Sequence, residues 1–300
     1  MHTPLRVVSI DTNLVRHLIE TQFPQWAHLD IKPVERSGWD NRTFLLGDGM
    51  SVRLPSAEGY APQAEKEHRW LPILAPQLPL PVPTLVIGGE PDALFPWKWG
   101  VYRWIDGEPA NSGHIADLSE FAVSLADFLR NLQQIDITGA PLAGPHSAFR
   151  GAPLSVYDEE TRKAITQLRS IVNADLALTI WNDALSTTWD KSPVWFHGDV
   201  AAGNLLVRSG RLHAVIDFGC CGVGDPACDL VIAWTLLRGE SRAVFREELN
   251  VDEGTWARGR GWALWKALIT VQEYRNAVNE PKRMDAWNTL SPVAYGAFLI

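Results

Sequence analysis

The sequence predicts an α+β protein of two lobes, with a β-rich N-terminal lobe and a mainly helical C-terminal lobe. Strand signals dominate the beginning of the chain, helical periodicity dominates the rest, and the breaker Asp106-Gly107-Glu108-Pro109 separates the two parts. We therefore expect an N-terminal lobe over residues 1–105, a hinge near 103–107, and a C-terminal lobe over 106–300.

The N-terminal lobe opens with an amphipathic helix over residues 11–22, for which Asp11 or its neighbour Thr12 is a suitable N-cap. We expect this helix to be peripheral. Two short strands follow at 43–46 and 50–54 around a glycine-containing turn, which is a hairpin signal.

A second helix and a long strand complete this lobe. Residues 62–75 have helical spacing, and the proline-rich segment PQLPLPVPT after them ends the helix and continues as extended chain. Residues 95–105, with the sequence FPWKWGVYRWI, are aromatic and apolar, which is typical of a buried strand.

The C-terminal lobe begins with the clearest helical pattern in the chain, a broad apolar stripe over residues 117–135. Further helices are expected at 158–172, at 175–190 and within 226–300. Between them stand three short β-rich runs, VWFHGDV, NLLVR and LHAVIDF, separated by loops.

Composition restricts the class of protein. Of the 300 residues, 46% are hydrophobic and 21% charged, which is typical of a folded chain with a substantial core. The formal charge is −8, and the lysines and arginines are scattered, which argues against a nucleic-acid-binding surface. An acidic balance of this kind would attract a cationic small molecule, although it is common in cytosolic proteins and usually reflects only solubility.

The cysteines and the apolar segments suggest a location. Cys220, Cys221 and Cys228 form no disulfide framework, so we expect a reducing compartment and buried, non-ligating thiols. The first twenty residues lack an apolar stretch after a basic start, and no window is apolar enough to span a membrane. We expect a cytoplasmic protein without a membrane partner.

The chemistry is concentrated in HGDVAAGNLLV at 197–207 and VIDFG at 215–219. These segments present Asp199 and Asn204 at the mouth of a β-loop-β element, and Asp217 at the end of the returning strand. Phosphoryl transfer needs such a set of oxygen atoms. One carboxylate, Asp199, would orient an acceptor hydroxyl and take its proton, while the other two residues would hold Mg²⁺ ions against phosphates.

With GDPACDL beginning at Gly224, this arrangement resembles the aminoglycoside phosphotransferase family, which shares the protein-kinase fold. The resemblance is strong from 195 to 234 and looser over the N-terminal lobe. It implies an enzyme that transfers the γ-phosphate of ATP or GTP to a hydroxyl of a small polar acceptor, such as an aminoglycoside or macrolide antibiotic. It also implies Asp199 as the catalytic residue, and Asn204 and Asp217 as ligands of Mg²⁺.

Three further motif residues are interpreted as structural support. His197 resembles the family's histidine that supports the loop backbone, although a general-base role is the alternative. Asp225 suits a tight turn in GDP, and Asp229 suits a helix start, where a carboxylate accepts hydrogen bonds from unpaired N–H groups. For Asp199, Asn204 and Asp217 the alternative is that they are loop-capping and turn residues in an unrelated α+β protein.

The resemblance assigns nucleotide binding to the N-terminal lobe. The loop from Ser37 to Asn41 would cover the phosphates, and Arg53 stands where the family commonly has a lysine. Arginine keeps the charge and can bind phosphate through two N–H groups. Its partner is expected to be Glu67, with Glu65 as the alternative, and an exposed strand position for Arg53 is the competing interpretation.

At the hinge, main-chain groups of Arg103 and Ile105 would pair with the edge of the base. Tyr102 would stand at the gatekeeper position, although an ordinary core aromatic is equally consistent with the sequence. Most of the fourteen tryptophans, including Trp234, Trp256, Trp262 and Trp265 in the C-terminal helices, are expected in the core, while one or two would line the acceptor pocket.

Three other functions compete with antibiotic phosphorylation. A metabolic kinase for choline, a sugar or homoserine uses the same scaffold, because fold does not determine substrate. A nucleotide-binding pseudoenzyme is favoured only by Arg53 in place of lysine. A protein kinase is disfavoured, because no activation segment with an A-P-E-like end lies between Asp217 and Pro226.

Overall fold

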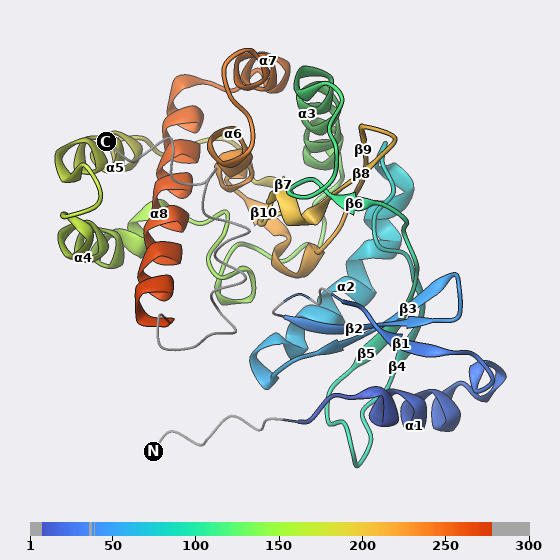
Figure 1. The fold of residues 1–300 in the computed structure, drawn as a ribbon. Coiled ribbons are helices and arrows are strands. Elements are labelled where there is room, and N and C mark those ends of the chain that lie inside the picture. The colour runs from blue at the N-terminus through green and yellow to red at the C-terminus, as the bar shows by residue number, and fades with distance from the viewer. Residues whose placement is uncertain (1–7, 36–37, 39, 278–300) are drawn as a thin grey trace. The chain divides into compact units, whose positions relative to one another are not determined.

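The computed structural model describes residues 8–35, 38 and 40–277, which divide into two units. Unit 1 contains the chain as far as Asp106 together with Asp217–Gly219, and unit 2 contains Gly107–Ile216 and the chain from Cys220 onward. Figure 1 shows a sheet with helices packed on it in the first unit, and a group of helices with short strands in the second. Within the described residues, no helix has both the length and the apolar composition to cross a membrane.

Unit 1 is built on a five-stranded antiparallel sheet with the strand order β1-β2-β3-β5-β4. Its strands are β1 (Ile31–Pro33), β2 (Asn41–Leu46), β3 (Met50–Pro55), β4 (Leu85–Gly89) and β5 (Trp99–Arg103). The predicted hairpin is confirmed as β2 and β3, with Gly47 in the left-handed region at φ 58°.

Helix α1 (Thr12–Gln22) begins at the predicted N-cap, where the Asp11 carboxylate accepts a hydrogen bond from the amide of Leu14 at 2.9 Å. The expectation that this helix is peripheral was wrong. Its apolar side chains, Val15 and Ile19 among them, are fully buried and join Phe44 of the sheet in one core. An apolar stripe predicts which face is covered, but the depth of burial depends on the partner.

Helix α2 (Ala61–Leu74) covers the other face of the sheet, opposite α1 (Figure 1). It agrees closely with the predicted helix at 62–75 and contains Pro72 near its end. Successive side chains of β3 and β5 alternate between the face covered by α1 and the face covered by α2. Val52 and Val101 belong to the core that contains α1, whereas Arg53 and Tyr102 contact Glu67 of α2.

The predicted strand at 95–105 is shorter in the structure, where β5 begins at Trp99. Phe95 and Trp97 are nevertheless buried, in a loop that the Asp92 carboxylate holds by accepting hydrogen bonds from the amides of Leu94 and Phe95. Residues 95–98 were predicted as strand because their buried aromatic side chains resemble the pattern of a strand. Strand β4 was missed, since its segment was read as extended chain without a pairing partner.

Unit 2 contains six α-helices in its described part. They are α3 (Leu118–Gln134), α4 (Asp158–Leu168), α5 (Ala174–Leu185), α6 (Ile232–Thr235), α7 (Glu240–Leu249) and α8 (Glu253–Ala277). The clearest predicted helix is confirmed as α3, with Asp117 as its N-cap. Helices α4 and α5 are confirmed but end four to five residues before their predicted limits. Helix α8 packs against both α4 and α5.

Two small sheets position the motif loops of unit 2. One pairs β7 (Val194–Phe196) with β10 (Gly222–Gly224), and the other has the order β6-β8-β9, with β6 (Glu108–Pro109), β8 (Leu205–Arg208) and β9 (Arg211–Val215). The three predicted β-rich runs are therefore confirmed. Strands β6 and β10 were missed, because two or three residues carry no alternation of their own and depend on their partners.

Candidate active site

The β8–β9 hairpin places two of the predicted site residues at its open end. The amide of Ile216 donates to the carbonyl of Asn204 at 2.9 Å, which closes the end of the hairpin away from its Ser209-Gly210 turn. Asn204 is the last residue of a 3₁₀ helix, η6 (Ala202–Asn204), and Asp217 follows Ile216 directly in the chain. The spacing between Asn204 and Asp217 is therefore the length of one short hairpin.

Both carboxylate oxygens of Asp199 are held by side chains of unit 2. The Nδ2 group of Asn204 donates to Asp199 Oδ2 at 3.0 Å and to the Asp199 carbonyl at 2.9 Å. Lys266 of α8 donates from Nζ to Asp199 Oδ1 at 2.5 Å. Because the amide nitrogen of Asn204 makes both bonds, its Oδ1 atom, which would bind a cation, has no partner within the described residues.

The electrostatic surroundings keep Asp199 ionised. Burial by itself would raise the pKa of this carboxyl, but the charge and hydrogen bond of Lys266, assisted by the charge of Arg150, lower it to about 2. The side chain remains 30% exposed. At neutral pH Asp199 therefore accepts hydrogen bonds, and it can orient a hydroxyl group.

His197 and Asp229 hold the backbone of the same loop. The buried His197 ring accepts a hydrogen bond from the Asp199 amide at Nδ1 (3.2 Å) and donates from Nε2 to the Ile216 carbonyl (3.1 Å), as the tautomer with its proton on Nε2 does. The Asp229 carboxylate accepts from the amides of His197 (2.8 Å) and Gly198 (2.7 Å). We expected it to accept from N–H groups at a helix start, so its partners were predicted wrongly.

Gly198 shows why the loop needs this sequence. Its φ is +85°, and a Cβ atom at this position would lie 2.6 Å from the carbonyl oxygen of Cys220. A side chain is therefore excluded both by the backbone conformation and by the neighbouring chain.

Asp225 caps the 3₁₀ helix η8 (Pro226–Val231) by accepting from the amide of Ala227 at 3.0 Å. It also forms a buried ion pair that the sequence did not reveal. Arg258 of α8 donates from Nε to Asp225 Oδ2 at 2.6 Å, and both side chains are about 5% exposed. Arg258 further donates to the hydroxyls of Thr187 and Thr255.

Arg258→Ala should lower the free energy of unfolding by about 3–5 kcal/mol, because it leaves the Asp225 carboxylate buried without its counter-ion. Urea denaturation would measure the change. Arg211→Ala is the matched control, since the Arg211–Glu120 pair is exposed and its loss should cost less than about 1 kcal/mol. Equal losses in the two variants would contradict a supporting role for Asp225.

In unit 1, Arg53 of β3 and Glu67 of α2 lie together, with 3.0 Å between Nη1 and Oε2. Tyr102 completes the group, because its hydroxyl donates to Glu67 Oε2 at 3.2 Å and its ring lies 5.1 Å from the Arg53 guanidinium carbon. Burial alone would lower the pKa of Arg53, but the Glu67 charge outweighs it and raises that pKa. The second oxygen of Glu67, Oε1, is buried without a partner within the described residues.

Asp217 belongs to unit 1, as Arg53 does, and its charge helps to raise the pKa of Arg53. Its φ of +70° is uncommon for a residue with a side chain, and strained backbone of this kind is concentrated at functional sites. The next residues approach α2 closely, since a Cβ on Gly219 would lie 2.7 Å from Oε1 of Gln63. Gln63 also donates to Asp40 at 2.9 Å.

The remaining predicted nucleotide residues are only partly tested. Ser37 lies outside the described residues, and Asn41 begins β2 opposite Pro55. The amide of Arg103 donates to the carbonyl of Thr84 at 2.9 Å, so this amide is not available to pair with a base. Within the described residues, the amide of Ile105 has no hydrogen-bond partner.

A cavity of about 10 Å³ adjoins Asp199, which is room for about one water molecule. The lining includes Lys266, Arg150, Trp262 and Trp265. Trp262 and Trp265 therefore lie beside Asp199, and whether a tryptophan lines an acceptor site stays a prediction. Lys266 and Arg150 were missed, because no local pattern connects them to a loop 67 or 49 residues away.

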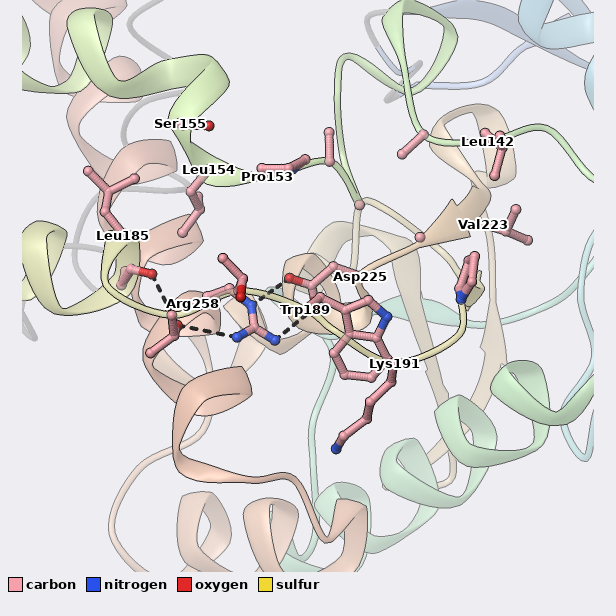
Figure 2. Close-up of a pocket in the computed structure, with 18 residues that line it drawn as sticks. Leu142, Pro153, Leu154, Ser155, Leu185, Trp189, Lys191, Val223, Asp225 and Arg258 are labelled. Carbon is pink, nitrogen blue, oxygen red and sulfur yellow. Dashed lines mark hydrogen bonds and ion pairs between the residues drawn. The ribbon is translucent and has the colours of Figure 1, made fainter.

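A larger pocket of about 440 Å³ in unit 2 has a mainly apolar lining and contains the Asp225–Arg258 pair. Figure 2 shows this pair beside the indole of Trp189, with Leu154 and Leu185 on the opposite wall. The pocket shares no residue with the cavity beside Asp199. The larger volume of this pocket is therefore no evidence that it is the active site.

Comparison with known proteins identifies the family whose sequence profile matches this chain. The profile of the phosphotransferase enzyme family matches residues 30–262. No curated protein sequence matches the chain at a significant level.

Three solved structures share the fold. The GDP complex of aminoglycoside 2'-phosphotransferase-IIIa is 18% identical with a TM-score of 0.73, covering 95% of this chain and 99% of its own. The streptomycin–ATP complex of APH(2")-IIa is 19% identical, with a TM-score of 0.60 and coverages of 96% and 98%. Macrolide 2'-phosphotransferase MphH from Brachybacterium faecium is 21% identical, with a TM-score of 0.62 and coverages of 93% and 98%. The α+β, protein-kinase-like fold class predicted from the sequence is confirmed.

Proposed function

We propose that this chain, which belongs to the phosphotransferase enzyme family, transfers the γ-phosphate of ATP or GTP to a hydroxyl of a small polar acceptor. The observation that carries the proposal is the Asp199 carboxylate, ionised and held through both oxygens by Asn204 and Lys266. A carboxylate in this state accepts the hydrogen bond of an alcohol and directs its oxygen toward phosphorus.

Phosphoryl transfer also requires cations at the phosphates, and the donor set suits Mg²⁺. Asn204 Oδ1 has no partner within the described residues, and the Asp217 side chain likewise makes no hydrogen bond there. Oxygen atoms of carboxylate and amide groups are the ligands that Mg²⁺ accepts in phosphoryl-transfer sites. Bound Mg²⁺ would neutralise the developing negative charge on the phosphates.

Nucleotide binding is assigned to unit 1. Arg53, kept charged and oriented by Glu67, would hold phosphate oxygens, and the loop that ends at Asn41 would cover them. The Arg103 carbonyl and the Ile105 amide would pair with the base edge. His197, Asp225 and Asp229 would support the backbone and take no direct part in the transfer.

The acceptor is the finer part of the proposal. Solved relatives carry the names of aminoglycoside and macrolide phosphotransferases, so these antibiotics are the first candidates. A metabolic alcohol is the second candidate, and the cationic side chains beside Asp199 favour it. We expect no nucleic-acid or membrane partner, and a cytoplasmic location.

A transfer screen tests this function. Purified protein with Mg²⁺ and either ATP or GTP is offered aminoglycosides, macrolides and metabolic alcohols, and nucleoside diphosphate release is measured with and without each acceptor. Acceptor-dependent release with at least one compound supports the proposal. Nucleotide binding without release under all conditions would instead identify a pseudoenzyme.

Tyr102→Met should move nucleotide preference toward ATP. The buried tyrosine ring occupies the position next to Glu67 and Arg53, where a bulky side chain leaves less room for the exocyclic amine of adenine. The values of kcat/KM for ATP and GTP measure the preference. Tyr102→Phe is the matched control, because it removes the hydrogen bond to Glu67 and keeps the ring. A parent enzyme with strong ATP preference, or an equal shift in both variants, would show that Tyr102 is only a core aromatic.

A further inference from the structure

The surroundings of Asp199 are cationic on the side that faces the small cavity. Lys266 and Arg150 both line it. Lys266 is paired with Asp199, and Arg150 forms no ion pair within the described residues. No carboxylate of the described residues lies within ion-pair distance of its guanidinium, whose Nη1 donates to the Ala148 carbonyl at 3.0 Å.

Aromatic rings hold Arg150 in place. Its guanidinium carbon lies 4.7 Å from the ring centre of Trp265 and 5.8 Å from that of Trp262. Tyr157 stacks on Trp265 with 4.3 Å between ring centres. A guanidinium supported in this way loses little freedom when it binds a planar anion, so it is well prepared for a carboxylate.

A hydrogen-bond donor without a partner in the described residues also favours an anionic ligand at this cavity. Trp262 is 1% exposed and lines the cavity, and its Nε1 group has no acceptor within the described residues. Glu160 contacts Trp265, and its Oε2 already accepts a hydrogen bond from the Trp265 Nε1 group at 2.8 Å. Apart from Asp199, the polar groups of this lining are therefore donors or cations.

Resting on the proposed function, we propose that the acceptor is a hydroxyl compound that carries a carboxylate, which Arg150 binds while the hydroxyl lies at Asp199. A polyamine sugar fits this lining poorly, because its ammonium groups would face Arg150 and Lys266, and Asp199 is the one carboxylate among the described residues that line the cavity. The negative net charge of the whole chain does not change this, since the nearest charges dominate at short range.

Three sugars that share the same ring but differ in charge test the proposal. They are glucuronate, glucose and glucosamine, and binding is measured by saturation-transfer NMR while transfer is measured with ATP or GTP and Mg²⁺. Glucuronate should bind at least tenfold more tightly than glucosamine. Arg150→Glu should reverse this order, and Arg150→Lys should keep it. Arg169→Glu is the control, because it makes the same change in net charge at an exposed position outside the cavity.

The outcomes separate this proposal from the proposed function. Failure of transfer to any acceptor, with the binding order as expected, would overturn the phosphotransfer assignment and leave the carboxylate site supported. Transfer to amine-bearing acceptors alone would overturn the carboxylate proposal and leave phosphotransfer supported. Glucuronate that binds no better than glucosamine, the absence of binding by both included, also overturns the carboxylate proposal, as does an unchanged order in Arg150→Glu.

Discussion

Asp199→Asn should reduce kcat by roughly 10²–10⁴-fold, which is the usual contribution of a positioned acid–base group. Asparagine has nearly the same shape as aspartate, but it is neutral and cannot take the proton of the acceptor hydroxyl. Its amide would also lose the charge attraction of Lys266, which now bonds to Oδ1. Single-turnover rates with a saturating acceptor measure the loss at the chemical step.

Nucleotide binding should be nearly unchanged in this variant, because Asp199 is assigned to the acceptor. Asp190→Asn, at an exposed position, serves as the control for the loss of one negative charge. A rate within about threefold of the parent would lie far below the expected effect and would remove Asp199 from the catalytic role.

Asp217→Asn should weaken Mg²⁺-dependent nucleotide binding and lower the rate by more than about 10²-fold, the upper end of the cost of losing an outer-shell partner of a metal ligand. Asparagine is preferred to alanine here because it tolerates the left-handed conformation at φ +70°, so the backbone should be retained. Nucleotide affinity measured over a Mg²⁺ titration reports the metal contribution directly.

The control for this variant is Asp30→Ala, which removes a carboxylate that is 80% exposed in the same unit. It should leave the Mg²⁺ dependence of nucleotide binding as it is in the parent. If Asp217→Asn also retains the parental Mg²⁺ dependence, Asp217 is not a metal ligand, whatever its effect on the rate.

Local patterns were sufficient for much of the fold. The β2–β3 hairpin, α2 and α3 were predicted nearly to their ends, because turn residues, caps and apolar periodicity act over a few positions. The pairing of Arg53 with Glu67 was also anticipated, since a strand and the helix that follows it bring residues fourteen positions apart into contact. Strands β4, β6 and β10 were not predicted, because their residues become strands only beside a partner.

The sequence by itself determined the protein-kinase-like class and the order and spacing of His197, Asp199, Asn204 and Asp217, because that motif lies on one short loop and hairpin. Only the tertiary structure decided which side chains surround Asp199 and Asp225. Lys266, Arg150 and Arg258 come from segments 33 to 67 residues away, and their contacts depend on how α8 and the loop before α4 pack. Charge pairing over such separations leaves no periodicity in the sequence, since it is created by packing and not by local backbone preference.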